Sequence, residues 1–209
     1  HKTLLAELDY RREAGNLTLL ADNLAEFERI VVPRPVPDYS AARVLTMDYI
    51  AGNKIDSVSP VVLLESDGDA LAEELFRAYL KQIFVDGFFH ADPHPGNVFL
   101  TDDGRVALLD LGMVDRIGPR LQEQLLQMVL AVSEGRADEV SDIAIKIGET
   151  TEEFDEKEFR ERVEDVVART QDSSLGDLQV GKVFLDMTKQ AGEVGIRMPQ
   201  ELTVLGKAL

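Results

Sequence analysis

The sequence predicts an α+β fold that is mostly helical. Apolar residues recur at helical spacing over residues 69–87 and again from residue 119 onward. Two short apolar runs, 97–101 and 105–110, are separated by Asp102-Asp103-Gly104, which is a strong hairpin signal. Hydrophobic residues make up 44% of the chain, which is typical of a folded globular protein and argues against disorder.

The N-terminal quarter predicts one helix and one strand. Residues 3–29 have a helical pattern with a break near Gly15. Residues 30–37 contain too many prolines for a central strand. Residues 43–50 are rich enough in β-branched and aromatic side chains to predict a strand. The following Ala51-Gly52-Asn53 predicts a turn.

The remaining two thirds predict helices around the hairpin. The clearest helix spans residues 69–87, where Gly87 supplies a C-terminal stop, and a proline-rich loop follows over residues 90–96. From Pro119 onward the pattern is helical, with breaks at Gly135, Gly148 and residues 172–176. We interpret three apolar stripes as core packing. These are Leu71, Leu75, Tyr79, Ile83 and Phe84; Leu121, Leu125, Met128, Val129 and Val132; and Phe159, Val163, Val166 and Val167.

Composition excludes several classes of function. The chain has no cysteine, which rules out disulfides, thiolate nucleophiles and cysteine-based zinc sites. The net charge of −17 disfavours nucleic acid as a partner, because such binding depends on Lys and Arg at phosphates. This charge does not exclude ATP. No apolar run approaches the ~20 residues that span a bilayer, and no secretion signal opens the chain.

The hairpin predicts a divalent-metal site. If Asp103-Gly104 is a two-residue loop, Asn97 faces Asp110 across the hairpin, and a three-residue loop would shift them by one position and leave them neighbours. Cross-strand partners lie ~5 Å apart. Amide and carboxylate oxygens are the ligands that suit Mg²⁺. Asp92, five residues before Asn97, would direct its carboxylate into the same space.

Asp110 follows the apolar run 106–109 and precedes Gly112. A carboxylate at the end of a buried strand is costly unless it has a partner. Asp110 could instead cap a turn while Asn97 begins a strand by chance. The joint spacing of the two residues favours a shared site.

These residues resemble a known catalytic pattern. His-x-Asp-x-x-x-x-Asn, a hairpin and then Asp-x-Gly, found at His90, Asp92, Asn97, Asp110 and Gly112, resembles the core of the protein-kinase-like fold. The stretches GFFHADPHPGN, DLGMV and ELDYRREAGN resemble the UbiB family of atypical kinases more specifically. The resemblance covers nearly the whole chain.

The resemblance implies a lobed architecture. Residues 1–50 would form part of the N-lobe, with helix C and the hinge strand. Residues 51–209 would form a helical C-lobe with the catalytic loop and the metal-binding hairpin. The N-terminal strands, the phosphate loop and the strand lysine would lie before His1, so we expect a piece of a longer protein that by itself binds ATP poorly.

The resemblance also implies site roles, with ATP and Mg²⁺ as cofactors. Asp92 would orient an acceptor hydroxyl or attacking water and accept its proton, while Asn97 and Asp110 would hold Mg²⁺ across the phosphates. Glu13 would pair with the lysine that steadies the α- and β-phosphates. Glu7 and Asp9 match the Glu-x-Asp motif of the family, which lies near the nucleotide; without that motif these acids would be read as a solvated helix face.

Further residues have supporting roles in this pattern. His90 would pack beneath the metal-binding turn, and His94 lies in a loop whose shape its flanking prolines would fix. In the hinge, the Asp48 carbonyl and the Ile50 amide would face adenine, with Met47 as gatekeeper. A simple edge strand is the alternative for that segment.

The resemblance implies an ATPase or small-molecule kinase linked to ubiquinone or other prenyl-lipid biology, in the cytoplasm or peripherally on a membrane. A prenyl-lipid or phenolic ligand would be its partner. Met113 leads to Pro119 with no long activation segment and no Ala-Pro-Glu, which disfavours phosphorylation of proteins in trans. The alternatives are a phosphotransferase of the aminoglycoside or choline kinase type, a pseudokinase scaffold, and a metal hydrolase that uses His90, Asp92 and His94.

Overall fold

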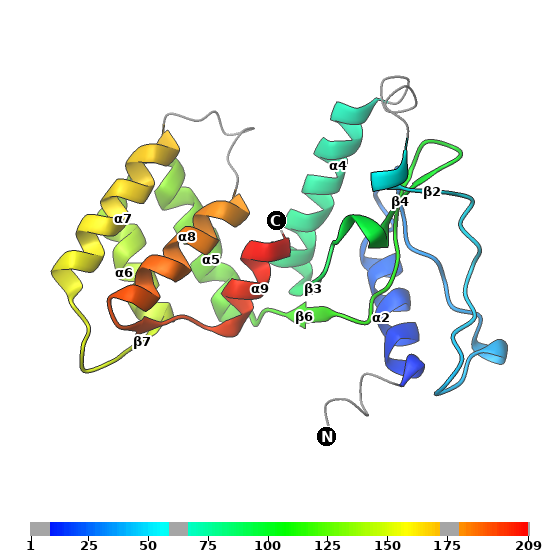
Figure 1. Cartoon of the computed structure of the whole chain (residues 1–209), viewed down its shortest axis with the longest axis horizontal. Coiled ribbons are helices and arrows are strands. Elements are labelled where there is room, and N and C mark those ends of the chain that lie inside the picture. The colour runs from blue at the N-terminus through cyan, green and yellow to red at the C-terminus, as the bar shows by residue number, and fades with distance from the viewer. Residues whose placement is uncertain (1–8, 59–66, 172–179, 209) are drawn as a thin grey trace. The chain divides into compact units, whose positions relative to one another are not determined.

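The computed structural model describes residues 9–58, 67–171 and 180–208, and it divides into two compact units, His1–Val114 and Asp115–Leu209. The first unit combines two longer helices with a four-stranded sheet, and the second is mainly helical (Figure 1). The α+β prediction is therefore confirmed. Among the described residues, each helix is too short or too polar to cross a lipid bilayer.

Helix α2 (Tyr10–Asn23) opens the first unit. Its N-cap is Asp9, whose side chain accepts a hydrogen bond from Arg11 N at 3.2 Å. The helix passes through Gly15 without a break, so that part of the prediction was wrong, and the predicted residues 3–8 lie outside the described residues. It also ends earlier than predicted, because residues 24–29 form turns. A longer helix would place two glutamates of that segment at its negative C-terminal end.

The main sheet has the strand order β1-β5-β4-β2. Strand β1 (Ile30–Val31) pairs in parallel with β5 (Val106–Leu108), and β4 (Val98–Thr101) pairs antiparallel with both β5 and β2 (Gly52–Lys54). Strand β1 is a short edge strand, in agreement with the exclusion of residues 30–37 from a central position.

Strand β2 replaces the turn that the sequence predicted at residues 51–53. Gly52 pairs with Thr101, and a Cβ built on Gly52 would lie 2.4 Å from the Leu100 carbonyl oxygen. Only a glycine allows this close approach of the two backbones. The glycine that suggested a turn is thus a requirement of the strand pairing.

The strand predicted over residues 43–50 was wrong. That segment makes only isolated bridges, Ala41 with Val44 and Pro35 with Met47. Hydrogen bonds run from Val36 N to Thr46 O at 2.7 Å and from Asp48 N to Arg34 O at 2.9 Å. The facing segment has prolines at 33, 35 and 37, and each proline holds φ near −65°, away from the value of about −140° in an antiparallel strand.

The predicted helix 69–87 is confirmed as α4 (Gly68–Lys81), continued by the π-helix η3 (Gln82–Asp86). Gly87 ends it in the left-handed conformation, at φ 60°. Strand β3 (Phe88–His90) follows and forms a two-stranded sheet with β6 (Val114–Arg116). The short 3₁₀ helices are η1 (Pro37–Tyr39), η2 (Ile55–Ser57) and η4 (Pro95–Asn97).

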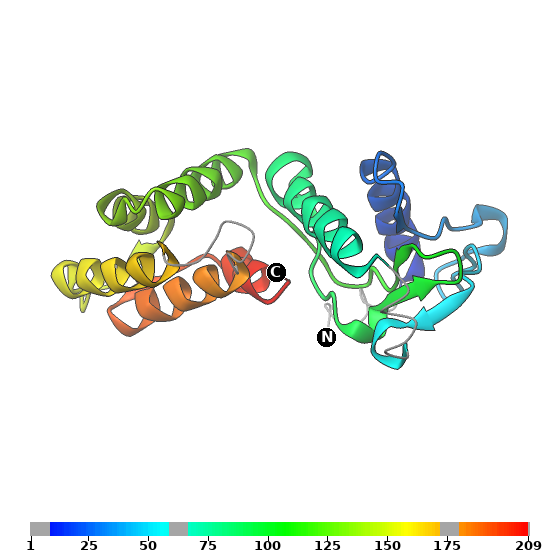
Figure 2. The same cartoon turned by 90° about the horizontal axis from the view of Figure 1, so that it is seen from above.

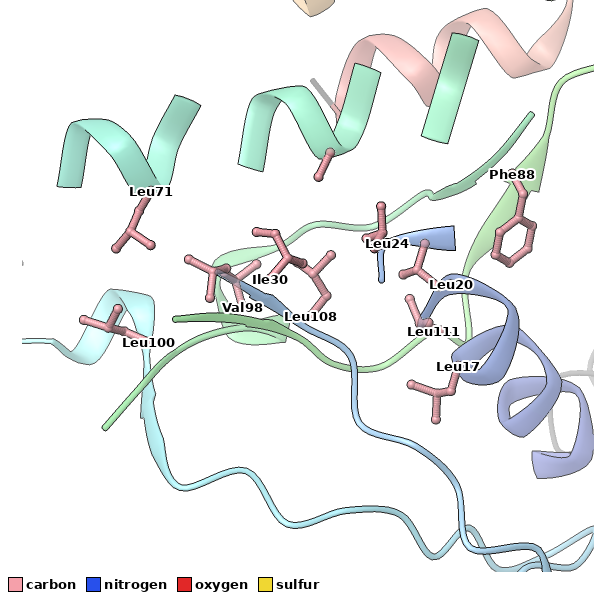
Figure 3. Close-up of a cluster of buried hydrophobic side chains, with 12 residues drawn as sticks. Leu17, Leu20, Leu24, Ile30, Leu71, Phe88, Val98, Leu100, Leu108 and Leu111 are labelled. Atoms are coloured by element: carbon pink, nitrogen blue, oxygen red, sulfur yellow. The ribbon is translucent and has the colours of Figure 1, made fainter. Parts of the chain in front are cut away.

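One cluster of buried side chains joins these elements (Figure 3). It contains Leu17, Leu20 and Leu24 of the α2 region, Leu71 and Ala78 of α4, Ile30, Phe88, Val98, Leu100, Val106 and Leu108 of the strands, and Leu111. Leu111 directly follows Asp110 and is fully buried, and Figure 3 shows it among the α2 leucines. The core therefore packs α2 against the segment that carries the predicted metal ligand.

The second unit confirms the helical prediction from residue 119 onward. Its helices are α5 (Pro119–Ser133), α6 (Ala137–Ile147), α7 (Glu156–Gln171), α8 (Val180–Glu193) and α9 (Gln200–Ala208). Helices α7 and α8 lie side by side (Figure 2). The unpredicted strands β7 (Glu149–Thr150) and β8 (Ile196–Arg197) pair with each other. Gly135 and Gly148 do end helices, and the break predicted at 172–176 lies outside the described residues.

Candidate functional site

The loop after β3 brings Asp92 and Asn97 together. The Asn97 side-chain nitrogen donates to the Asp92 carbonyl oxygen at 3.3 Å and lies 3.5 Å from the carboxylate Oδ2 of Asp92. Pro95 begins the 3₁₀ turn η4, which ends at Asn97. Because its nitrogen faces Asp92, the Asn97 amide presents its oxygen as the remaining acceptor atom.

The hairpin between β4 and β5 has a three-residue loop. Thr101 N donates to Arg105 O at 2.8 Å, and Gly104, with φ 81°, donates to Thr101 O at 3.0 Å. The Thr101 hydroxyl also accepts from Arg105 N at 2.8 Å. Left-handed glycine at the last loop position is typical of three-residue hairpins. The two-residue loop was therefore wrong, and the alternative register applies.

This register moves the predicted cross-strand partner by one residue. Val98 pairs with Leu108, and Leu109 N donates to Asn97 O at 2.8 Å. Asn97 thus lies opposite Leu109, and Asp110 is the next residue along the strand. The two predicted metal ligands are neighbours at the open end of the hairpin, as the alternative loop length required.

Asp110 has an unusual backbone conformation. At φ 58° it is the sole non-glycine residue with positive φ in the part of the chain that the structure describes. Its Oδ1 accepts a hydrogen bond from Gly112 N at 3.2 Å, and a Cβ on Gly112 would lie 3.1 Å from the same oxygen. Such strained positions cluster at functional sites.

The Asp110 carboxylate is exposed. The burial cost that we expected for it therefore does not arise, because the chain buries Leu111 and turns Asp110 outward. An exposed carboxylate held by a local hydrogen bond suits Mg²⁺, which is bound by one or two protein oxygens together with phosphates. Asn97, one register position away on the facing strand, offers an amide oxygen. Asn97 and Asp110 are thus the residues that could hold the ion.

Helix α2 approaches the same turn. The Asn16 side-chain nitrogen donates to the Leu111 carbonyl oxygen at 2.9 Å. One helical turn earlier, the pKa of Glu13 is raised, first by burial and second by the negative charge of Asp110. Glu13 therefore lies close to the turn. Sequence reasoning assigned no role to Asn16, although its position three residues after Glu13 places both on one helix face.

His90 lies beneath the loop, fully buried. Its main-chain nitrogen donates to Gln82 Oε1 at 3.0 Å. Its ring Nδ1 accepts from Asp92 N at 3.3 Å in the tautomer whose proton is on Nε2, and the Met113 carbonyl oxygen lies 3.4 Å from the same Nδ1. Burial is the largest cause that lowers the pKa of His90, which favours the neutral ring. This geometry fits the structural role predicted for His90. Gln82 was missed, because a polar residue in a helical pattern gives no signal of burial.

His94 forms the cap of η4. Its Nδ1 accepts from Gly96 N at 3.0 Å, and the side chain is exposed. In the neutral ring the proton then lies on Nε2. In the described part of the chain, no three His, Asp or Glu side chains are grouped as metal ligands, which disfavours the hydrolase that would use His90, Asp92 and His94.

The other predicted residues lie in the N-terminal segments. Glu7 is outside the described residues, and Asp9 caps α2. In the hinge segment the Asp48 carboxylate accepts from Arg34 N at 3.1 Å, and Met47 is exposed. The adenine contacts of the Asp48 carbonyl and the Ile50 amide stay predictions.

Comparison with known proteins identifies the family of this chain. The family model of the ABC1 atypical kinase-like domain matches residues 1–144. The chain belongs to the UbiB family of atypical kinase-like proteins. The family resemblance inferred from the motifs is thereby confirmed.

Curated relatives of this UbiB-family chain come from plants and bacteria. A chloroplastic Arabidopsis thaliana protein named ACTIVITY OF BC1 COMPLEX KINASE 8 is 38% identical over 69% of the chain and 19% of its own length. The Synechocystis protein slr0889 is 30% identical over the whole chain and 53% of its length. A Vibrio atlanticus protein named probable protein kinase UbiB is 29% identical over the whole chain and 39% of its length. The chain thus spans about half or less of the length of these relatives.

A solved structure supports the same fold. The complex of Rv3197 with erythromycin, from Mycobacterium tuberculosis, matches with a TM-score of 0.50 and 26% identity, over 70% of this chain and 37% of the other. The fold is therefore kinase-like and α+β. The assignment of residues 1–50 and 51–209 to two kinase lobes stays a prediction.

Proposed function

We propose that this UbiB-family chain forms the phosphate end of an ATP- and Mg²⁺-binding site in an atypical kinase or ATPase. The observation that supports this is the meeting of Asp92, Asn97 and the Asp110 turn at the open end of the β4–β5 hairpin. Family membership gives this arrangement its chemical meaning. Phosphoryl transfer needs mainly positioning and charge stabilisation, which these groups can supply.

Asn97 and Asp110 are the proposed Mg²⁺ ligands. The ion, when bound, would neutralise and orient the phosphates. Asn97 is held by its contacts with Asp92 and by the main-chain bond to Leu109, so its amide oxygen has a fixed direction. Asp110 is held by Gly112 N and by the buried Leu111 beside it. Both ligands are therefore positioned by main-chain contacts before any ion arrives.

Asp92 is the proposed acceptor of the substrate proton. Its carboxylate lies against the Asn97 amide, and its main-chain nitrogen is held by His90 Nδ1. The acid is therefore tied to a buried ring on one side and to a metal ligand on the other. This arrangement would hold Asp92 beside the phosphate end, where it can orient a hydroxyl or water and accept its proton.

Helix α2 would complete the phosphate side. The burial that raises the pKa of Glu13 lets a cation pair strongly with it, and the proposed cation is the lysine of an upstream strand. Glu7 and Asp9 are proposed to lie near the nucleotide. The Asp48 carbonyl and the Ile50 amide, with Met47, are proposed to contact adenine.

The proposed biological role is support of ubiquinone or other prenyl-lipid biosynthesis, and it rests on relatives named UbiB. A phenolic or prenyl-lipid ligand, and a cytoplasmic or peripheral membrane location, belong to the same proposal. Phosphorylation of proteins in trans is disfavoured, because strand β6 follows the Asp110 turn at once and α5 begins at Pro119. That spacing leaves no room for a long peptide-binding segment.

A second candidate is a small-molecule phosphotransferase of the aminoglycoside or choline kinase type. The observation that favours it is the similar structure of Rv3197 in complex with erythromycin, a small molecule with several hydroxyl groups. A third, a nucleotide-binding pseudokinase scaffold, differs by having no turnover.

Mg-ATP binding and ATPase turnover of the full-length protein test the proposal, with Asp110→Asn as the diagnostic variant. Asp103→Asn is the matched control, because Asp103 lies in the loop at the other end of the same hairpin. We expect Asp110→Asn to weaken magnesium-dependent binding and turnover by about tenfold or more and Asp103→Asn to change neither. Equal Mg-ATP affinity and turnover in both variants would remove the site assignment.

Two further results separate the candidate functions. Binding of Mg-ATP without turnover in the wild type would favour the pseudokinase scaffold. A panel of phenolic, prenyl-lipid, aminoglycoside and macrolide ligands would separate the possible phosphoryl acceptors.

A further inference from the structure

One side-chain hydrogen bond connects α2 directly to the segment that carries the proposed metal ligand. The Asn16 amide nitrogen donates to the Leu111 carbonyl oxygen at 2.9 Å, across 95 residues of sequence. The bond is partly buried. Its acceptor is the main chain between Asp110 and Gly112, so the bond acts on the turn itself.

The turn depends on such support. Asp110 has a left-handed φ of 58°, which a residue with a Cβ adopts only when its surroundings hold it there. The Gly112 N–H on the Asp110 carboxylate is a local bond within the turn and cannot fix the turn relative to the rest of the molecule. Leu111, buried among Leu17 and Leu20, provides apolar packing without direction. The Asn16 bond adds direction, because a hydrogen bond to a carbonyl fixes where that carbonyl points.

Helix α2 is itself anchored at both ends. At its C-terminal end, Lys81 Nζ donates to Asn23 O at 2.7 Å and binds the Asp86 carboxylate at 2.9 Å. At its first turn, Tyr10 N donates to Ala42 O at 3.1 Å. These hydrogen bonds fix the position of the helix on its neighbours, and Asn16 lies between the two bonded ends.

We propose that Asn16 is a positioning residue that connects the Asp110 turn to α2. The Asp110 carboxylate then has the orientation for metal binding only while α2 keeps its packed position. The inference rests on the proposed magnesium site. Asn16 does not act on the phosphates; it acts through the Leu111 carbonyl. A displacement of α2 would release this carbonyl and let Asp110 leave its left-handed conformation.

The charge of the neighbourhood explains why an amide suits this position. Glu13 and Asp110 both bring negative charge to the same space. A neutral donor can bond the Leu111 carbonyl without adding to that charge. An aspartate at position 16 has nearly the same shape but no N–H, and it would add a third carboxylate beside an acceptor.

Two variants and one control test the inference in the full-length protein. Asn16→Asp reverses the polarity of the contact, and Asn16→Leu removes it while keeping a similar volume, should the aspartate variant fail to fold. Thr18→Ala is the matched control, because the Thr18 hydroxyl bonds only the Ala14 carbonyl of the same helix on its exposed side. Two quantities are measured. The first is amide hydrogen exchange over residues 109–113, and the second is the Mg²⁺ concentration for half-maximal binding of ATP.

We expect both Asn16 variants to exchange faster at the turn and to need about threefold to tenfold more Mg²⁺, which is the range that loss of one hydrogen bond produces. Thr18→Ala should match the wild type in both measurements. Unchanged exchange at the turn in the folded Asn16 variants would overturn the inference. Faster exchange with an unchanged Mg²⁺ requirement, in a protein whose Asp110→Asn variant binds Mg-ATP more weakly than the wild type, would also overturn it. If Asp110→Asn itself binds Mg-ATP like the wild type, the proposed function fails as well, and the metal-positioning role falls with it.

Discussion

Replacement of Gly112 by alanine should weaken magnesium-dependent nucleotide binding without unfolding the protein. Gly112 does not have a left-handed φ, so an alanine meets no backbone strain there. Its Cβ would instead lie 3.1 Å from Asp110 Oδ1, and that oxygen is the one that accepts the Gly112 N–H at 3.2 Å. The substitution therefore acts on the carboxylate and on little else.

The size of the effect follows from these distances. Nonbonded carbon and oxygen atoms make an ordinary van der Waals contact at about 3.5 Å or more. The Asp110 carboxylate must therefore move by about 0.4 Å from the new Cβ. That shift exceeds the tolerance of about 0.2 Å for metal–ligand distances. It also stretches the hydrogen bond from Gly112 N beyond useful length, at a net cost of about 1 kcal/mol. We therefore expect an affinity for Mg-ATP about fivefold weaker.

The assay is calorimetric titration of the full-length protein with ATP at several Mg²⁺ concentrations, alongside thermal unfolding. Gly118→Ala is the control, because a Cβ at Gly118 meets no atom within 4 Å. Gly112→Ala should keep the unfolding temperature of the wild type and require more Mg²⁺. Wild-type Mg²⁺ dependence in the folded variant would refute the reasoning that Gly112 is small to make room for a metal-binding carboxylate.

Three further substitutions test the electrostatics and the backbone in the 209-residue chain. The pKa of Glu13 is raised from 4.5 by burial and then by Asp110, so at this site the folded state binds protons more readily than the unfolded state. The stability that Glu13 contributes is fully present below pH 4.5 and is lost as pH rises through its folded-state pKa. Glu13→Gln should therefore raise the free energy of unfolding in urea at pH 7 and leave it unchanged in acid below pH 4.5. Gly15→Ala lies within α2 with no atom within 4 Å of the new Cβ, and it should raise the unfolding free energy by about 0.5–1 kcal/mol in the same assay. Gly52→Ala would place its Cβ 2.4 Å from Leu100 O and should lower the unfolding temperature, at a cost of about 1–3 kcal/mol.

The parts of the fold that the sequence predicted well are those set by local patterns. The apolar stripe over 69–87 and the stop at Gly87 gave α4 and η3 almost to the residue. The hairpin followed from Asp102-Asp103-Gly104, but its register did not. The loop has three residues because the Thr101 side chain binds Arg105 N and Gly104 adopts the left-handed conformation. The residues Asp102-Asp103-Gly104 are compatible with a two-residue loop and with a three-residue loop.

The failures concern partners that are distant in sequence. Residues 43–50 have strand propensity, yet a strand needs an extended partner, and prolines hold φ of the facing segment near −65°. Gly52 suggested a turn because the close backbone of Leu100 is invisible in the sequence. Strand propensity depends on the residues of one segment, whereas strand pairing also depends on the segment that it pairs with.

In the candidate site, too, the local features were predicted from the sequence and the contacts between distant segments were not. The spacing of Asp92, Asn97 and Asp110 within one loop and one hairpin was enough to predict that their chain segments lie together, whereas the shared metal site stays a prediction. The exposure of Asp110 was not predicted, because an apolar strand before it suggested burial. The bond between Asn16 and Leu111 spans 95 residues, and only the packing of α2 on the turn brings its two ends together.

The central claim is that Asn97 and Asp110 bind the same divalent ion, and a double-mutant cycle on Mg-ATP affinity tests it most directly. Asn97→Ala, Asp110→Asn and the double variant would be titrated in the full-length protein. Two ligands of one ion act as a unit, so each single change should cost about tenfold or more and the double variant should be little worse than the weaker single. Additive losses, or a single variant that binds Mg-ATP like the wild type, would contradict a shared ion.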